Sequence, residues 1–295
     1  MHLRVGTRGS ALARTQTDLA IQILIDAGRG RGIDVTAEVV VIKTSGDESQ
    51  ASSFEAIGPK GVFARELQRA LLEGRIDVAV HSLKDLESSE PDGLVIGAVP
   101  KREDPRDVLV SRSGLTLAEL EPGSVVGTSS SRRRSLLALA RPDFDVAPLR
   151  GNVDTRLRKI ADGEVDAGIL AGAGLLRLQR DGEVTEWLEP TSFVPAPGQG
   201  ALAIETRAED AFAWISSADD ADTRVCVETE RAFMRLVESG CEAPLGAWAR
   251  VESGELVCTA FVANDGDGVI GTVRGALDPA LIATELAAHL ALPAS

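Results

Sequence analysis

With 295 residues, 44% of them hydrophobic, the chain can bury the cores of two or three domains, so we expect a globular protein. Its formal net charge of −14 argues against nucleic acid and anionic membranes as partners, because both require a basic surface. No apolar run reaches the roughly 20 residues of a membrane helix, and the charged N-terminus "MHLRVGTRGSALAR" differs from a signal peptide. We therefore expect a cytoplasmic protein.

The first 82 residues alternate between strand and helix patterns. The strand "LRVGT" precedes a helix over residues 10–28, which Gly28 ends. The apolar face of this helix contains Leu12, Leu19, Ile23 and Leu24. A strand, a helix and a further strand follow at residues 34–44, 61–74 and 76–82. This order predicts a βαβαβ unit.

The polar segment "TSGDESQASSFEAIGPKG" at residues 44–61 interrupts this unit. It has neither helix nor strand periodicity, and structureless loops of this length inside a compact domain tend to be lids or disordered segments. Because the segment leaves a strand end, we predict that it is a lid over a ligand site.

The same order of elements recurs from about residue 124. We predict strand, helix, strand, helix and strand at residues 124–128, 131–140, 144–149, 152–163 and 165–171. The stretch "VGTSSSRRRSLLAL" resembles the earlier "VGTRGSALA", and "IADGEVDAGI" resembles "LLEGRIDVAV". Two such halves, each with a mainly parallel sheet, normally face each other across a cleft that binds ligand where the strands end. We therefore expect the functional groups directly after the strands.

The remaining sequence predicts a third domain. A helix over residues 224–240 precedes antiparallel strands within 247–276, and "FVPAPGQGALAIE" at residues 193–205 suits a crossover around Gln199. The expected fold is α/β, with two periplasmic-binding-protein-like βαβ domains facing a cleft and a small C-terminal α+β domain with an antiparallel sheet. We place the domains at residues 1–100 with 200–220, 101–199 and 223–295.

Arginines recur at the predicted strand ends. Arg132, Arg133 and Arg134 fall in the first turn of a predicted helix, where the helix dipole is already positive, so an anion should compensate them. Ser129, Ser130 and Ser131 can cap this helix. The alternative is a solvated charge run paired with some of the 45 acidic residues.

Other strand ends carry the same signal. Arg8 and Ser10 follow the first strand, Arg150 follows the strand at residues 144–149, and Arg156 lies in the first turns of the next helix. Arginine grips carboxylates and phosphates with two parallel hydrogen bonds, so several converging arginines predict an anionic ligand. The chain has no GxxxxGK[ST] or GxGxxG motif, which disfavours a nucleotide.

The stretch "HSLKDL" places Lys84 and Asp85 directly after the strand at residues 76–82. Taken alone, these residues are more easily interpreted as a solvent lysine and a turn aspartate. Near several arginines, however, a carboxylate in a cleft can accept N–H donors or stabilise a developing cation, so Asp85 is a candidate for electrostatic and acid/base work.

The three cysteines show no disulfide or zinc pattern. Cys226 and Cys258 lie in apolar contexts typical of buried thiols. Cys241 differs, because "SGCEAPLG" is a turn, which makes this thiol a possible nucleophile or attachment point without a nearby histidine to activate it. The three histidines do not cluster, so we expect no metal site.

Eight short motifs together resemble the hydroxymethylbilane synthase family, also called porphobilinogen deaminase. In that family's order they are "TRGSALA", "GVFARELQRALL", "HSLKD", "REDPRD", "VGTSSSRRR", "LRGNVDTRL", "VPAPGQGA" and "ERAFMRLVESGC". The resemblance covers nearly the whole chain. It implies a cytoplasmic, monomeric transferase that condenses four porphobilinogen molecules with loss of ammonia and then releases a linear tetrapyrrole by hydrolysis.

The resemblance also assigns roles to residues. Cys241 would carry a dipyrromethane cofactor through a thioether, and Asp85 would be the catalytic carboxylate that contacts pyrrole nitrogens. The acetate and propionate groups of the cofactor would be held by Lys84, Ser130, Arg132, Arg133 and Arg156. The substrate porphobilinogen would be held by Arg8, Ser10, Arg150, Arg156, Arg177 and Gln199. The lid would contribute Lys60.

The chain departs from the family pattern in three places. The stretch "LESSEPDG" follows Asp85 in place of a "VP" word, Ala56 occupies a position where the family often has lysine, and Pro197 can stiffen the crossover.

Two other classes of function compete with this one. A non-catalytic, two-lobed anion-binding protein would explain the duplicated halves and the arginines, but it would not explain Cys241 or the third domain. A cysteine-dependent transferase lacks a histidine partner.

Overall fold

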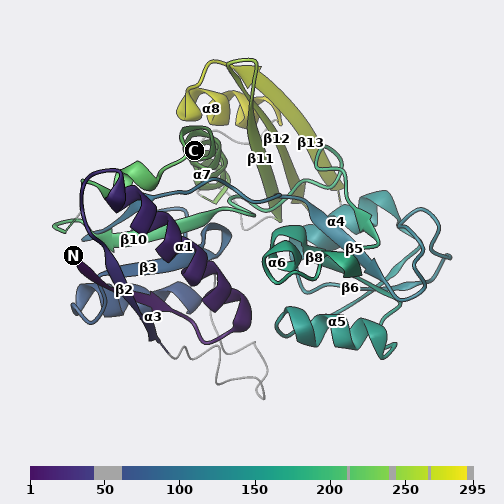
Figure 1. Ribbon diagram of the computed structural model, residues 1–295. Coiled ribbons are helices and arrows are strands. Elements are labelled where there is room, and N and C mark those ends of the chain that lie inside the picture. The colour runs from purple at the N-terminus through teal and green to yellow at the C-terminus, as the bar shows by residue number, and fades with distance from the viewer. Residues whose placement is uncertain (43–61, 211–212, 239–243, 265–266, 291–295) are drawn as a thin grey trace. The chain divides into compact units, whose positions relative to one another are not determined.

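The computed structural model describes residues 1–42, 62–210, 213–238, 244–264 and 267–290 (Figure 1). The chain forms two compact units, of which the first contains residues 1–102 and 201–224 and the second contains 103–200 and 225–295. Each unit is described by itself, and the predicted division into three domains stays a prediction. None of the described helices is both long and apolar enough to cross a membrane.

A five-stranded sheet forms the centre of the first unit. Its strands, in spatial order, are β2 (Thr36–Val41), β1 (His2–Thr7), β3 (Val78–Ser82), β10 (Leu202–Arg207) and β4 (Leu94–Ala98). β1 is parallel to β2 and β3, whereas β10 is antiparallel to β3 and β4. The sheet is therefore mixed, and the prediction of a mainly parallel sheet is wrong, because a buried apolar strand shows the same pattern in either direction.

Helices cover both faces of this sheet. The helical segments of the unit are α1 (Ala11–Arg29), α3 (Val62–Leu72) and the short turns η2 (Leu83–Asp85) and η4 (Ile215–Ala218). Val78 of β3 packs in one core with Leu24 of α1, whereas the next residue, Ala79, packs in another with Leu67 of α3. Because neighbouring residues of a strand point to opposite faces, α1 and α3 lie on opposite sides of the sheet (Figure 1).

Helix α1 differs from its prediction at two positions. Leu19 is 44% exposed, so it does not belong to the buried face. The helix continues through Gly28 to Arg29, and Gly30 caps it. A Cβ atom at Gly28 would lie 2.4 Å from Cγ2 of the buried Val35, so Gly28 provides room for packing and does not end the helix.

The second unit repeats the arrangement of the first. Its sheet has the order β7 (Asp145–Ala147), β6 (Val125–Gly127), β8 (Ala167–Ala171), β5 (Asp107–Ser111) and β9 (Glu186–Trp187). β6 is parallel to β7 and β8, and β5 is antiparallel to β8 and β9. The α/β class and the predicted duplication are confirmed, because each strand of one sheet has a counterpart at the same place in the other.

Helices again cover both faces. They are α4 (Ser131–Ala140), α5 (Val153–Ala161), α6 (Gly172–Arg177) and the short turn η3 (Asp181–Glu183). Ile169 of β8 packs with Leu136 of α4, whereas its neighbour Leu170 packs with Leu157 of α5. The helix predicted at residues 131–140 has the bounds that the sequence pattern indicates.

The C-terminal part contains the predicted antiparallel sheet, and helices cover one of its faces. The strands are β11 (Leu245–Glu252), β12 (Glu255–Asn264) and β13 (Asp267–Gly275), and the helices are α7 (Ala221–Glu238) and α8 (Pro279–His289) (Figure 1). Cys258 packs with Phe233 of α7 and Ile282 of α8, whereas Phe261 joins the core beneath α4. The central strand β12 is therefore buried on both faces, whereas most of β13 is exposed or half-buried.

The packing of Gly28 gives a stability prediction. We expect Gly28→Ala to lower the free energy of unfolding by about 1–3 kcal/mol, because the new methyl group overpacks the contact with Val35. Gly30→Ala is the matched control, because a Cβ there meets its nearest atom, the carbonyl oxygen of Ala27, at 3.5 Å. Denaturant unfolding measures both variants, and equal midpoints would contradict the packing role.

Candidate functional site

Two neighbouring strand ends of the first unit carry predicted site residues. β1 and β3 are adjacent and parallel, so Arg8 and Ser10 after β1 and the turn after β3 lie at the same edge of the sheet. The hydroxyl oxygen of Ser10 accepts a hydrogen bond from the backbone N–H of Ala13 at 3.2 Å and caps α1. The cap aims the N-terminus of α1 at this edge.

Asp85 ends the short turn η2 that follows β3. Leu83 at the start of the turn is buried, and its backbone N–H donates to the carbonyl oxygen of Ala201 at 3.0 Å. Lys84 is half-buried and Asp85 is exposed. The turn therefore fixes the backbone while it leaves the Asp85 carboxylate accessible to a ligand.

Two polar residues at this edge escaped the sequence analysis. Gln16 on α1 is 6% exposed, and its side-chain amide exchanges hydrogen bonds with the hydroxyl of Ser82, at 3.0 Å and 3.1 Å. This pair joins α1 to the residue that precedes the Asp85 turn. The sequence signal for this pair is a glutamine on the buried face of a helix, because a buried polar side chain requires a hydrogen-bond partner.

A buried polar cluster supports the strand that leads to Asp85. Nε2 of His81 lies 2.9 Å from Oε2 of Glu205 on β10, and Gln68 Nε2 donates to Oε1 of the same carboxylate at 3.0 Å. Both members of the His81 and Glu205 pair are nearly inaccessible to solvent. The cluster joins β3, β10 and α3, and it was not predicted because its members are far apart in the sequence.

The arginine run of the second unit is mostly buried. Ser130 caps α4 by accepting from the backbone N–H of Arg133 at 3.4 Å, which confirms a serine cap at this helix. Arg132 and Arg133 are 5% and 6% exposed, and Arg134 is exposed. Two of the three arginines therefore do not belong to a solvated charge run.

A single carboxylate, that of Asp107, pairs with both buried arginines. Arg132 Nη1 lies 2.8 Å from Asp107 Oδ2, and Arg133 donates to Oδ1 from Nε at 3.1 Å and from Nη2 at 2.7 Å. Gln199 Nε2 also donates to Oδ1 at 2.8 Å. Burial by itself would raise the pKa of Asp107, but the attraction of Arg132 and Arg133 outweighs burial and lowers that pKa far below its usual range.

The charges of this cluster do not balance. Arg132, Arg133 and Asp107 together carry one excess positive charge, and among the described residues no second carboxylate forms an ion pair with either arginine. Burial, the largest effect, lowers the pKa of Arg132, which expresses the cost of keeping this charge away from water. The cluster is therefore suited to bind an anion.

Three further predicted arginines of the second unit do not form ion pairs with Asp107. Arg150 is exposed after β7, and Arg156 on α5 donates from Nε to the carbonyl oxygen of Gly151 at 2.8 Å. Arg177 donates from Nη2 to the carbonyl oxygen of Gly200 at 2.6 Å, and burial lowers the pKa of its guanidinium. The structure thus joins Gln199, Arg132 and Arg133 through one carboxylate, whereas Arg156 and Arg177 donate to backbone carbonyl groups.

Some predictions fall outside the described residues. Cys241, Lys60, Ala56 and the whole of the predicted lid at 44–61 belong to this group. Cys226 and Cys258 are buried in the core of the C-terminal sheet, which confirms their interpretation as packed thiols. Among the described residues no group of three or more His, Cys, Asp or Glu side chains is arranged to hold a metal ion.

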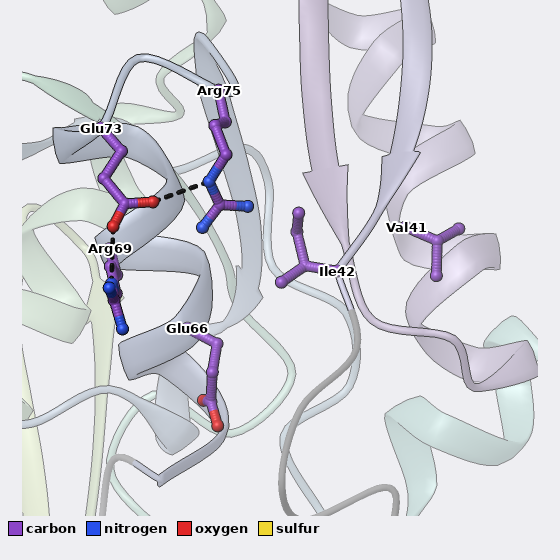
Figure 2. Close-up of a pocket in the computed structure, with 6 residues that line it drawn as sticks. All are labelled: Val41, Ile42, Glu66, Arg69, Glu73 and Arg75. Carbon is purple, nitrogen blue, oxygen red and sulfur yellow. Dashed lines mark hydrogen bonds and ion pairs between the residues drawn. The ribbon is translucent and has the colours of Figure 1, made fainter.

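A cavity of about 430 Å³ lies between β2 and α3 in the first unit (Figure 2). Figure 2 shows Glu73 between Arg69 and Arg75, whose Nε atoms donate to its carboxylate at 2.6 Å and 2.7 Å. These hydrogen bonds lower the pKa of Glu73. Because the lining holds two carboxylates, Glu66 and Glu73, against two arginines, it has no excess positive charge for an anionic ligand, and we place the candidate site at the strand ends.

Comparison with known proteins gives two family matches and a close relative. Residues 3–214 match the family described as porphobilinogen deaminase, dipyromethane cofactor binding domain, and residues 224–291 match porphobilinogen deaminase, C-terminal domain. The porphobilinogen deaminase of Brevibacillus brevis is 44% identical over 291 residues, which cover 97% of this chain and 93% of that relative.

A second relative and a solved structure extend the comparison. The porphobilinogen deaminase of Mycolicibacterium paratuberculosis is 49% identical over 251 residues, or 84% of this chain and 77% of that relative. The solved structure of the methionine binding protein MetQ covers 74% of this chain and 89% of its own, with 14% identity and a TM-score of 0.44, and we draw nothing from a likeness of this degree. Two family matches that together span most of the sequence, with relatives above 40% identity, are decisive: the chain belongs to the porphobilinogen deaminase family.

Proposed function

We propose that the chain is a hydroxymethylbilane synthase, a transferase that joins four porphobilinogen molecules head to tail onto a covalently held dipyrromethane and releases the linear tetrapyrrole by hydrolysis. Ammonia leaves at each condensation. The observation that carries the proposal is the buried pair Arg132 and Arg133 over the single carboxylate of Asp107 in a member of this family. The cytoplasmic location and the monomeric state are part of the proposal.

The buried cluster fits a group that carries carboxylates. Its excess positive charge lies in the first turn of α4, where the helix dipole adds positive potential. A buried positive charge is unfavourable without a partner, so an acetate or propionate side chain of a pyrrole would stabilise it.

Each predicted residue then has a role. Dipyrromethane, attached through the sulfur of Cys241, would supply the primer end at which the pyrrole chain grows. Its carboxylates would be held by Lys84, Ser130, Arg132, Arg133 and Arg156. Each incoming porphobilinogen would be oriented by Arg8, Ser10, Arg150, Arg156, Arg177 and Gln199, and Lys60 would act from the lid.

Asp85 is proposed as the catalytic residue. Its exposed carboxylate can accept hydrogen bonds from pyrrole N–H groups and can stabilise the positive charge that develops on porphobilinogen as ammonia leaves. It can also hold a proton during each condensation. The buried anchor at Leu83 keeps the carboxylate in place without covering it.

The alternative of a non-catalytic, two-lobed anion-binding protein is not favoured. Such a protein needs neither a covalent attachment point nor the C-terminal sheet, whereas residues 224–291 match the C-terminal domain of the enzyme family.

The first functional prediction concerns Cys241. Intact mass of the purified protein should exceed the sequence mass by one dipyrromethane, and Cys241→Ser should remove the addition, because serine cannot form the thioether. Peptide mapping supplies the control, since the peptides with Cys226 and Cys258 should be unmodified. Active protein with an unmodified Cys241 would exclude this attachment.

The second functional prediction concerns Asp85. We expect Asp85→Asn to lower the turnover of porphobilinogen by about 100-fold or more, the usual scale for loss of a general acid or base, with the fold retained. Glu87→Gln is the matched control, because Glu87 is an exposed carboxylate two residues away that pairs only at the surface with Arg65. Turnover near that of the unchanged protein would remove Asp85 from its role.

A further inference from the structure

We propose that Arg132 and Arg133 have different tasks, and that Asp107 is the positioning residue that separates them. Arg133 is held by the protein itself, whereas Arg132 presents its Nε and Nη2 atoms to a carboxylate of the bound pyrrole chain. This inference rests on the proposed function and refines it, because the family resemblance assigns the same role to both arginines, whereas here the main task of Arg133 is to hold α4 against Asp107.

All three nitrogen atoms of Arg133 are engaged within the protein. Nε and Nη2 donate to Asp107 Oδ1 at 3.1 Å and 2.7 Å, and Nη1 donates to the carbonyl oxygen of Ile169 on β8 at 2.9 Å. The side chain therefore bridges α4, β5 and β8 inside the core of the unit. A ligand that gripped Arg133 with two hydrogen bonds would have to break part of this bridge.

Arg132 is held through one nitrogen only. Its Nη1 donates to the carbonyl oxygen of Val194 at 2.6 Å and lies 2.8 Å from Asp107 Oδ2. Within the described part of the chain, Nε and Nη2 make no hydrogen bond. These two atoms form the edge of the guanidinium that binds a carboxylate with parallel hydrogen bonds.

The position of Asp107 explains this difference. The carboxylate is 0% exposed, and Arg133, Arg132 and Gln199 surround it. Consecutive residues of a helix differ by roughly 100° around its axis, so neighbouring arginines normally diverge. The Asp107 carboxylate contacts both side chains, but it accepts two hydrogen bonds from Arg133 and makes a single contact with Arg132.

The C-terminal sheet further restricts Arg132. A Cβ atom at Gly246 on β11 would lie 2.8 Å from the carbonyl oxygen of Val194 and 3.2 Å from Cδ of Arg132. The glycine therefore lets β11 pack directly against the stem of Arg132 and the carbonyl group that holds it. The stem is fixed from two sides, which orients the remaining edge of the guanidinium.

The test compares Arg132→Lys with Arg133→Lys. Both substitutions retain the positive charge and remove the guanidinium group, which donates two parallel hydrogen bonds to a carboxylate. Each protein is produced without porphobilinogen and then incubated with a series of porphobilinogen concentrations, and intact mass gives the concentration for half-maximal loading. For Arg132→Lys we expect this concentration to rise at least about tenfold, with an unchanged melting temperature of the unloaded protein. For Arg133→Lys we expect the melting temperature to fall by at least about 3 °C, with a rise in the half-maximal loading concentration of the folded fraction that is several times smaller than for Arg132→Lys.

Two controls and a charge-balance arm complete the experiment. Arg134→Lys, in the exposed neighbour on α4, should change neither quantity. Asp107→Asn should lower the melting temperature strongly, and adding Arg133→Gln to it should recover part of the loss, because the double variant restores one excess positive charge. Asp104→Asn, which removes a carboxylate paired with Arg106, is the control for Asp107.

The outcomes are separable. Equal effects of Arg132→Lys and Arg133→Lys on loading and melting overturn the division, as does a loading shift in Arg134→Lys as large as that in Arg132→Lys. If Arg133→Lys does not fold, the Arg132→Lys arm decides, and unchanged loading there overturns the proposal. If the unchanged protein gains no dipyrromethane mass, the proposed function fails, and this inference fails with it.

Discussion

The buried carboxylate of Asp107 is the interaction on which the second unit depends. Removing one partner of a buried ion pair typically costs about 3–5 kcal/mol, because the other charge stays buried without compensation. Here two guanidinium groups and the amide of Gln199 share one carboxylate, so α4, β5 and the segment around Gln199 are fixed together. The positions of Arg132 and Arg133 are therefore a consequence of core packing.

A comparison of the two duplicated sheets shows that the first unit has no counterpart of Asp107, Arg132 and Arg133 at the equivalent positions. Asp107 pairs with the last residue of β8, and at the same place in the first unit Leu202 pairs with the last residue of β3. Counted from the capping serines, Arg132 and Arg133 correspond to Leu12 and Ala13. The carboxylate and the arginines are thus present together or absent together, as charge compensation requires.

The sequence predicted local features well and long-range pairs poorly. The capped helix at 131–140 and the strand-end positions of Arg8 and Asp85 follow from short patterns of periodicity and capping. The Asp107 cluster joins residues from three separate parts of the chain. The stretch "REDPRD", which ends at Asp107, does not indicate which arginines pair with that carboxylate. Gly28 was misread because a glycine near a helix end signals a stop as readily as a close contact.

The two central aspartates work in opposite environments, which follows from their tasks. Asp85, the proposed catalytic residue, is exposed on a turn, where a carboxylate can meet successive substrates, whereas Asp107 is buried and held ionised by Arg132 and Arg133. Because the pKa of Asp107 is depressed in the folded state, its contribution to stability is complete above the unfolded value of about 3.9 and declines as the pH falls below it. At neutral pH the arginine cluster therefore keeps its single excess positive charge, and anion binding there does not depend on titration of Asp107.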